Sequence, residues 1–187
     1  MTDTETTTAI LRALEQRHNN GGNGLTPAWV FATELSLCTG FSSFHQMLLP
    51  HERDAYVDAG ISTFFLPGRI DAYALHTWPT KKMLRRAYEV KVSRSDLLRE
   101  LKHPKKRAGA LAVSNQFYLV VAEGVKCLTS ELDDEVGLIR WSRAGGLRTV
   151  KEPPYRKIPD PTVNFMMSLA RTVQKQATFT KDVSDSS

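Results

Sequence analysis

The chain has 187 residues, 41% hydrophobic and 24% charged, a composition typical of one globular domain with a sizeable core. No uncharged apolar run approaches the roughly 18 residues of a membrane span, so no membrane partner is expected. The start MTDTETTTAI also lacks the basic-then-apolar order of a signal peptide. Cys38 and Cys127 are far apart, which indicates free thiols in a reducing compartment such as the cytosol.

The net charge of +5 is unevenly distributed along the chain. Residues 69–107 contain twelve lysines and arginines against four acids, a net charge of +8, so the remaining residues total −3. One strongly basic segment in an otherwise mildly acidic chain favours a polyanionic partner such as nucleic acid. A solvated helix face is the alternative explanation for any single cluster of these cations.

The first half of the chain predicts one helix, an irregular stretch and a hairpin. Residues 6–20 have helical spacing and end at the breaker NNGGNG, whereas residues 27–37 fit a short helix or a helix that runs into a strand. Residues 41–63 have no clear period, and we interpret them as an insertion. Residues 69–78 and 85–93 are predicted strands that pair across the turn PTKKML.

The second half continues in a mixed order. A helix over residues 96–102, capped by Ser93 or Ser95, is interrupted at Pro104 and restarts over residues 105–114. Three strands and a closing helix follow, over residues 116–124, 135–141, 147–152 and 162–175.

This order of elements predicts an α/β fold with a mixed β-sheet flanked by helices. We expect a single domain over residues 1–177, with the insertion inside it. The Thr/Ser/Asp/Lys-rich residues 178–187 are predicted to form a disordered tail.

A charged pair interrupts the apolar strand RRAYEVKVS. Because side chains alternate along a strand, Glu89 and Lys91 share one face, and the predicted hairpin brings Asp71 close to Glu89. Two adjacent carboxylates repel each other, and Mg²⁺ removes that repulsion because it prefers oxygen ligands and keeps waters for substrate phosphates. Lys91 beside such an ion would orient or help to deprotonate a water, or stabilise phosphate charge. The pattern therefore favours metal-assisted phosphodiester hydrolysis.

These residues resemble the D…ExK signature of the PD-(D/E)XK nuclease superfamily, in RIDAYAL and YEVKVSRSD. The longer run YEVKVSRSDLLRELKHPKK, followed by FYLVVAEG, DDEVGLIRW and GGLRTVKEPP, is similar to the MmcB-like DNA-repair branch, which has many phage and prophage members. The resemblance covers about residues 27–172. It implies a restriction-endonuclease-like core in which Asp71, Glu89 and Lys91 are the catalytic residues.

The same resemblance implies a set of metal ligands. Asp71 and Glu89 would hold Mg²⁺, with Mn²⁺ as a substitute, and the Val90 carbonyl would add a ligand from the same strand. Members of the superfamily often carry a further acid on the helix before the first core strand. Glu34 in FATELSL is the candidate here, either as a ligand or as an organiser of metal-bound water.

Cations on both sides of the proposed site predict the surface that meets DNA. We expect them to flank the site in space and to neutralise phosphates without reading the bases. They are Lys81, Lys82, Arg85 and Arg86 around the hairpin turn, and Arg94, Arg99, Lys102, Lys105, Lys106 and Arg107 after Lys91.

The function expected from the sequence is that of a metal-dependent deoxyribonuclease in DNA repair, recombination or phage DNA metabolism, in the cytosol of a bacterium or a phage-infected host. The alternative is a non-catalytic DNA-binding or protein-interaction module that retains the nuclease fold. A second copy of the chain, or a repair or phage protein, stays open as a further partner.

Overall fold

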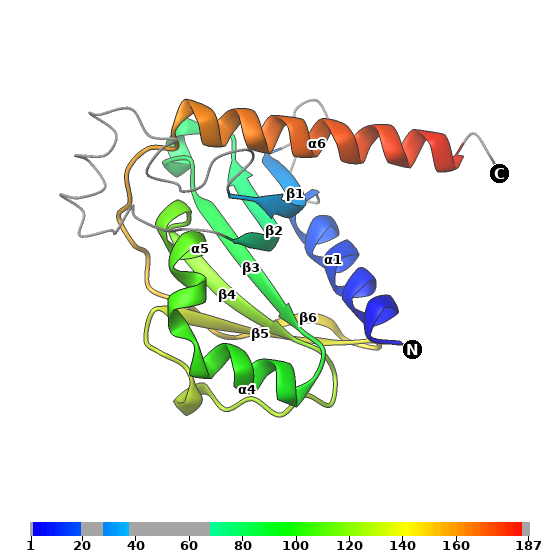
Figure 1. The fold of residues 1–187 in the computed structure, drawn as a ribbon, viewed down its shortest axis with the longest axis vertical. Helices are drawn as coiled ribbons and strands as arrows, with labels where there is room; N and C mark the ends of the chain where they lie inside the picture. Colours follow the sequence, from blue (N-terminus) through cyan, green and yellow to red (C-terminus); the bar gives the residue numbers. More distant parts are fainter. Residues whose placement is uncertain (1, 20–27, 38–67, 185–187) are drawn as a thin grey trace.

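Six strands form a single mixed sheet in the computed structural model, which describes residues 2–19, 28–37 and 68–184 (Figure 1). The strands lie side by side in the same order as in the chain. Their bounds are Trp29–Ser36 (β1), Arg69–His76 (β2), Arg85–Lys91 (β3), Gln116–Val121 (β4), Val136–Ser142 (β5) and Gly146–Lys151 (β6). β3, β4 and β5 are mutually parallel, whereas the other neighbours pair antiparallel.

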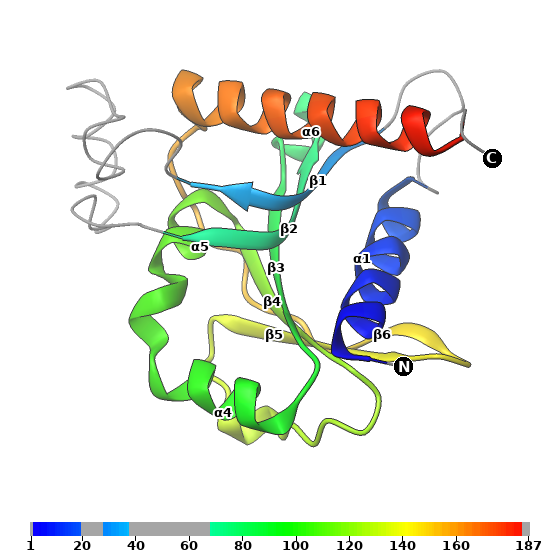
Figure 2. The same ribbon diagram turned by 45° about the vertical axis from the view of Figure 1, so that its right-hand side comes forward.

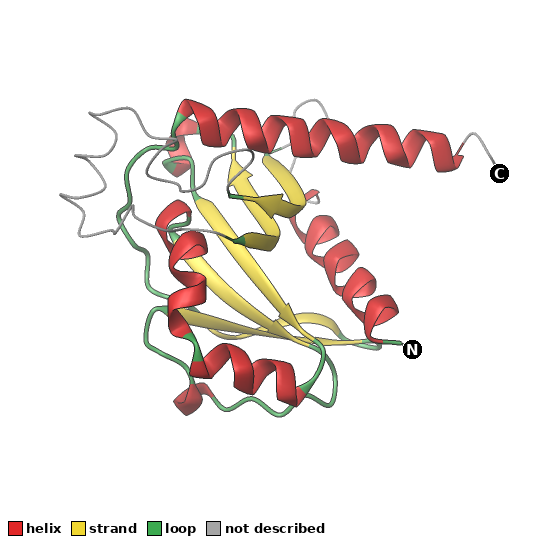
Figure 3. Ribbon diagram, in the orientation of Figure 1, coloured by secondary structure: helices red, strands yellow, loops and turns green. Residues whose placement is uncertain are grey.

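Helices cover both faces of this sheet (Figures 2 and 3). Their bounds are Asp3–Asn19 (α1), Arg94–Lys102 (α4), Ala108–Val113 (α5) and Val163–Ser184 (α6), with 3₁₀ turns at Pro79–Lys81 (η1), Pro104–Arg107 (η2) and Thr129–Glu131 (η3). The predicted α/β fold, a mixed sheet flanked by helices, is thus confirmed. No helix in the described part of the chain is both long and apolar enough to cross a membrane.

Two hydrophobic cores form because alternate strand residues point to opposite faces. On one face, Ile10 and Leu14 of α1 pack against Tyr88 and its neighbours in the sheet. On the other face, Leu97 of α4 and Phe165 of α6 join the apolar residues of the central strands. α6 also crosses the edge strand β1 (Figure 1). The amide of Gln176 donates to the Thr33 carbonyl at 2.7 Å there, so part of this exposed edge is covered.

The crossover between the parallel strands β3 and β4 contains α4, η2 and α5, as parallel pairing requires. Ser93 is the N-cap of α4, since its hydroxyl accepts from the Asp96 N–H at 3.2 Å; this resolves the choice between Ser93 and Ser95. α4 ends before Pro104, as the sequence predicts, but the helix restarts at Ala108 and not at residue 105, because the 3₁₀ turn η2 occupies Pro104–Arg107.

The prediction of a helix within residues 27–37 is wrong for the described residues, which form the strand β1. Pairing with β2 from Trp29–His76 to Ser36–Arg69 overrides the weak helical pattern. Glu34 has a left-handed backbone with φ 53°, so the strand is irregular at this residue.

The closing helix is longer than the sequence predicts. α6 continues to Ser184, past Thr178, where the disordered tail was expected to begin. No proline or glycine interrupts this stretch, and the Thr178 hydroxyl donates to the Gln174 carbonyl at 3.1 Å. The predicted insertion at 41–63 and Cys38 lie outside the described residues, whereas Cys127 is a buried free thiol.

Candidate active site

The candidate site lies where strands β2 and β3 diverge. Their backbone pairing ends at Ala72–Tyr88; beyond it β2 stays beside β1, and β3 stays beside β4 up to Lys91. Asp71 is the next residue of β2, and its Oδ2 accepts from the Val90 N–H at 2.8 Å. A carboxylate thus replaces a backbone carbonyl as the acceptor, which holds Asp71 at the point of divergence.

Glu89 and Lys91 lie on the same face of β3, as the alternation predicts. The Lys91 ammonium donates to Glu89 Oε1 at 2.9 Å, and Lys91 is only 5% exposed. Asp71 is close enough to Glu89 for its charge to contribute to the raised pKa of Glu89. The structure therefore brings together Asp71, Glu89 and Lys91, the three residues named from the sequence.

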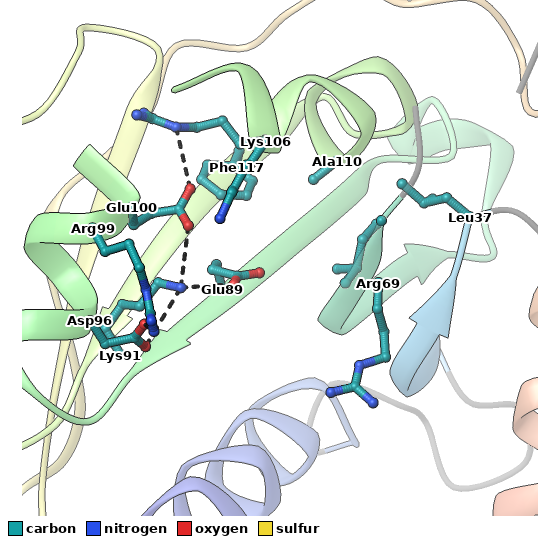
Figure 4. A pocket seen from close by; sticks show the side chains of 13 residues that line it. Leu37, Arg69, Glu89, Lys91, Asp96, Arg99, Glu100, Lys106, Ala110 and Phe117 are labelled. Atoms are coloured by element: carbon teal, nitrogen blue, oxygen red, sulfur yellow. Dashed lines mark hydrogen bonds and ion pairs between the residues drawn. The ribbon is translucent and has the colours of Figure 1, made fainter. Parts of the chain in front are cut away.

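Helix α4 adds two carboxylates that the sequence analysis did not assign to the site (Figure 4). Lys91 Nζ lies 3.3 Å from Glu100 Oε2 and 3.8 Å from Asp96 Oδ2. Glu100 is buried, and its other oxygen lies 3.7 Å from Nε of Arg107, which in turn contacts Asp133 at 3.1 Å. A chain of buried charges thus connects β3 to α4 and η2.

Burial is the main reason why the two site carboxylates, Asp71 and Glu89, are hard to ionise. Burial, followed by the charge of Asp71, raises the pKa of Glu89 to about 7, although Lys91 opposes the shift. Burial also raises the pKa of Asp71, against the Val90 N–H and Lys91. For Lys91, burial lowers the pKa, but Glu89, Glu100 and Asp96 outweigh it, so the net pKa is raised and the ammonium is retained.

A cavity of about 550 Å³ opens beside these residues. Glu89 and Lys91 form part of its wall, and Arg69, Arg99 and Lys106 supply positive charge around it. Arg69 lies on the opposite side of Glu89 from Glu100 (Figure 4). Arg69 and Arg99 are both largely exposed, although Arg69 pairs with Glu34 at 3.6 Å and Arg99 with Asp96 at 2.6 Å.

The carboxylates of Asp71 and Glu89 are of the ligand type that a hard divalent cation prefers. Asp71 and Glu89 offer half-buried carboxylate oxygens whose repulsion a cation would relieve, and Mg²⁺ is commonly held by only one or two protein carboxylates. Within the described residues no group of three His, Cys, Asp or Glu side chains could hold a metal ion. The Val90 carbonyl as a ligand stays a prediction.

The helix predicted to carry Glu34 does not exist, because Glu34 lies on β1. The β1–β2 register places Glu34 opposite Asp71, and its charge contributes to the raised pKa of Asp71. Its side chain is 64% exposed and pairs with Arg69. Glu34 therefore lies next to the site, but outside the buried cluster of carboxylates.

Only some of the expected DNA-binding cations lie around the site, among them Arg99 and Lys106. Lys81 and Lys82 lie beyond the opposite end of β3 from Lys91. The six residue steps from Arg85 to Lys91 span about 20 Å, so the expectation that these lysines flank the site is wrong. Arg85 is buried, and Arg86 bonds Gln116 and stacks over the Trp29 ring at 5.2 Å.

The cations that follow Lys91 also divide into two groups. Arg94 binds Glu131 and the Lys126 carbonyl, and Arg107 is buried in its ion pairs, so both stabilise the fold instead of presenting a free charge. Three others are exposed, namely Arg99, Lys102 and Lys106. The side chain of Lys105 lies outside the described residues.

Fold and site together define an α/β protein with an acid–lysine cluster at a divergence of two strands. A scan of known protein families finds no matching model, and a search of curated proteins finds no match. Among solved structures, the chain is similar to the SPO1766 protein of unknown function from Silicibacter pomeroyi, with a TM-score of 0.57 and 17% identity over 98% of this chain and 94% of that chain. This likeness shows the fold alone.

Proposed function

We propose that the chain is a Mg²⁺-dependent deoxyribonuclease of the PD-(D/E)XK superfamily, with a restriction-endonuclease-like core and closest in kind to the MmcB-like branch. One observation carries the proposal: Asp71, Glu89 and Lys91 come together where two strands diverge, and Glu89 and Lys91 line a cavity that has cations around it. Cleavage of DNA phosphodiester bonds in repair, recombination or phage DNA metabolism, in the cytosol of a bacterium or an infected host, is the role that this chemistry fits.

The residues have distinct roles in this proposal. Mg²⁺, when bound by Asp71 and Glu89, would supply Lewis-acid stabilisation of phosphate charge and activation of water. Lys91 is held as an ammonium by three carboxylates, which favours stabilisation of negative charge over removal of a proton. Arg69 and Lys106 would position the phosphates at the cavity.

The proposal is tested by incubating labelled linear, nicked, branched and single-stranded DNA with Mg²⁺, Mn²⁺ or EDTA. We expect metal-dependent products from the wild type and a loss of rate of about a hundredfold or more in Lys91→Ala, the usual scale for removal of one charge-stabilising donor. Asp71→Asn should lose metal binding as well as cleavage. Lys157→Ala, at an exposed lysine outside the cavity, is the matched control and should cleave normally.

A second candidate is a non-catalytic DNA-binding or protein-interaction module. The observation in its favour is that Lys91 forms ion pairs with Glu89, Glu100 and Asp96. These ion pairs also stabilise the packing of α4 against β3. DNA that is bound but left uncut by wild type and Lys91→Ala alike, under every metal condition, would favour this module and contradict the nuclease.

A further inference from the structure

A second cavity, of about 460 Å³, lies at the end of β4 against the turn of the β5–β6 hairpin. Its lining includes three cations, Lys126, Arg140 and Arg148, and one acid, Glu123. Glu123 is hydrogen-bonded within the fold, since its Oε2 accepts from the Arg143 N–H at 3.2 Å. The sequence pattern predicted no role for these residues, all of which lie outside the basic segment 69–107.

Arg140 and Arg148 are direct cross-strand partners in the β5–β6 pair. Like charges at directly opposite positions of a sheet repel each other and reduce stability. Arg140 donates to the Cys127 carbonyl at 2.8 Å, but no ion pair of the described residues includes Lys126, Arg140 or Arg148. The lining therefore has three cations against one acid, Glu123, and the cavity keeps a net positive charge within the described part of the fold.

The register of the sheet relates this cavity to the candidate active site. Lys91 pairs with Val121, Val121 with Arg140, and Arg140 with Arg148, so the four residues form one row across β3–β6. With about 4.8 Å between neighbouring strands, the Arg148 backbone lies about 15 Å from that of Lys91. A nucleic-acid strand carries one charge per about 3.4 Å of helix axis, so this distance corresponds to about four nucleotides.

We propose that the cavity lined by Lys126, Arg140 and Arg148 binds the phosphodiester backbone of the DNA strand whose reacting phosphate lies at Asp71, Glu89 and Lys91. This inference rests on the proposed function and names where the substrate continues beyond the site. It also explains why two repelling arginines occupy opposite positions, since bound phosphates compensate their charge. The interaction depends on charge and carries no preference for base sequence.

The test compares Arg140→Gln/Arg148→Gln with the wild type for binding of a fluorescent 20-nucleotide single strand and the corresponding duplex, by anisotropy in EDTA over a range of salt concentrations. We expect affinity to fall about tenfold or more at low salt. The slope of log affinity against log salt should decrease by about 1.4 for the single strand and about 1.8 for the duplex, for two lost phosphate contacts. Unchanged affinity and slope would overturn the inference.

The matched control is Lys157→Gln/Arg171→Gln, which removes the same charge at two exposed positions outside both cavities. It should retain wild-type affinity within about twofold; an equal loss would mean that only net charge matters and would overturn the inference. Thermal unfolding provides a check on folding, because removing a repelling arginine should leave the melting temperature unchanged or higher.

Two further outcomes separate this inference from the proposed function. DNA that binds through Arg140 and Arg148 but is never cut would support the binding site and contradict the nuclease. DNA that is cut, with no effect of Arg140→Gln/Arg148→Gln on binding, would support the nuclease and contradict the binding site. Poly-glutamate is the competitor for an acidic protein partner, and equal binding of poly-glutamate and DNA, lost together in the variant, would overturn the assignment to nucleic acid.

Discussion

Single residues determine how the charges of the site are held. Strand alternation alone places Glu89 and Lys91 on one face, and hairpin pairing adds Asp71. Glu100 was not predicted to belong to the site, although the sequence contains a signal for it. Glu100 follows Leu97 by three residues and therefore shares the buried face of α4. An acid at an apolar position of an amphipathic helix indicates a buried partner, which here is Lys91.

Glu100→Gln is expected to destabilise the fold by about 2 kcal/mol, because Lys91 and Arg107 both lose a buried, charge-assisted partner while each keeps another carboxylate. Urea unfolding measures this change. Under the proposed function, cleavage should also slow, since Lys91 would be less firmly positioned.

The control for Glu100→Gln is Asp134→Asn, which removes an equivalent charge from an exposed residue. It should alter the free energy of unfolding by less than about 0.5 kcal/mol. A Glu100→Gln protein as stable as this control would show that the buried ion pairs contribute nothing net.

At the scale of elements, the strongly patterned segments were predictable and the weakly patterned one was not. The hairpin of β2 and β3, the apolar strand β4 and the β5–β6 pair are confirmed because each combines strand-forming residues with clear turn signals. The segment of β1 was predicted to contain a helix. The prediction failed because pairing with β2, a long-range interaction, decides the conformation of this segment.

Close packing of two elements explains the glycine at position 137. A methyl group there would lie 2.6 Å from both the Tyr118 ring and the Pro153 ring, too close for either to accommodate without movement. Gly137→Ala should therefore lower the free energy of unfolding by about 1–3 kcal/mol, as overpacking does. The control is Gly68→Ala, whose added carbon would meet only Leu37 at 3.7 Å. Equal stability of the two variants in urea would contradict the packing argument.

At the scale of the whole molecule, α1 carries a buried histidine that links its docking to pH. His18 is 2% exposed, bonds the Tyr88 hydroxyl at 2.8 Å and packs against the Trp29 ring at 4.5 Å. Burial, then the charges of Arg86, Arg17 and His76, lower its pKa to about 3. The folded chain therefore keeps His18 neutral under conditions in which the unfolded chain protonates it.

Stability should consequently fall as the pH decreases from about 6.5, the ordinary pKa of histidine, towards 3. The unfolded state binds the extra proton in this window, and His18 alone should account for about 3 kcal/mol at pH 4. Urea unfolding at pH 7, 5.5 and 4 measures the effect: His18→Gln should lose less stability on acidification than the wild type. His103→Gln, at an exposed histidine, should behave like the wild type, and identical pH profiles for all three would refute the assignment.

Sequence alone determined most of the helices and strands, the mixed sheet and the grouping of Asp71, Glu89 and Lys91, because hydrophobic period and strand alternation are local properties. Tertiary structure alone decided which cations are free. Arg94 and Arg107 belong to the predicted basic segment yet are held in ion pairs, whereas Arg140 and Arg148 lie outside it and face a cavity. Whether a charge meets solvent or a carboxylate depends on contacts between residues distant in sequence, and these form only when the sheet assembles.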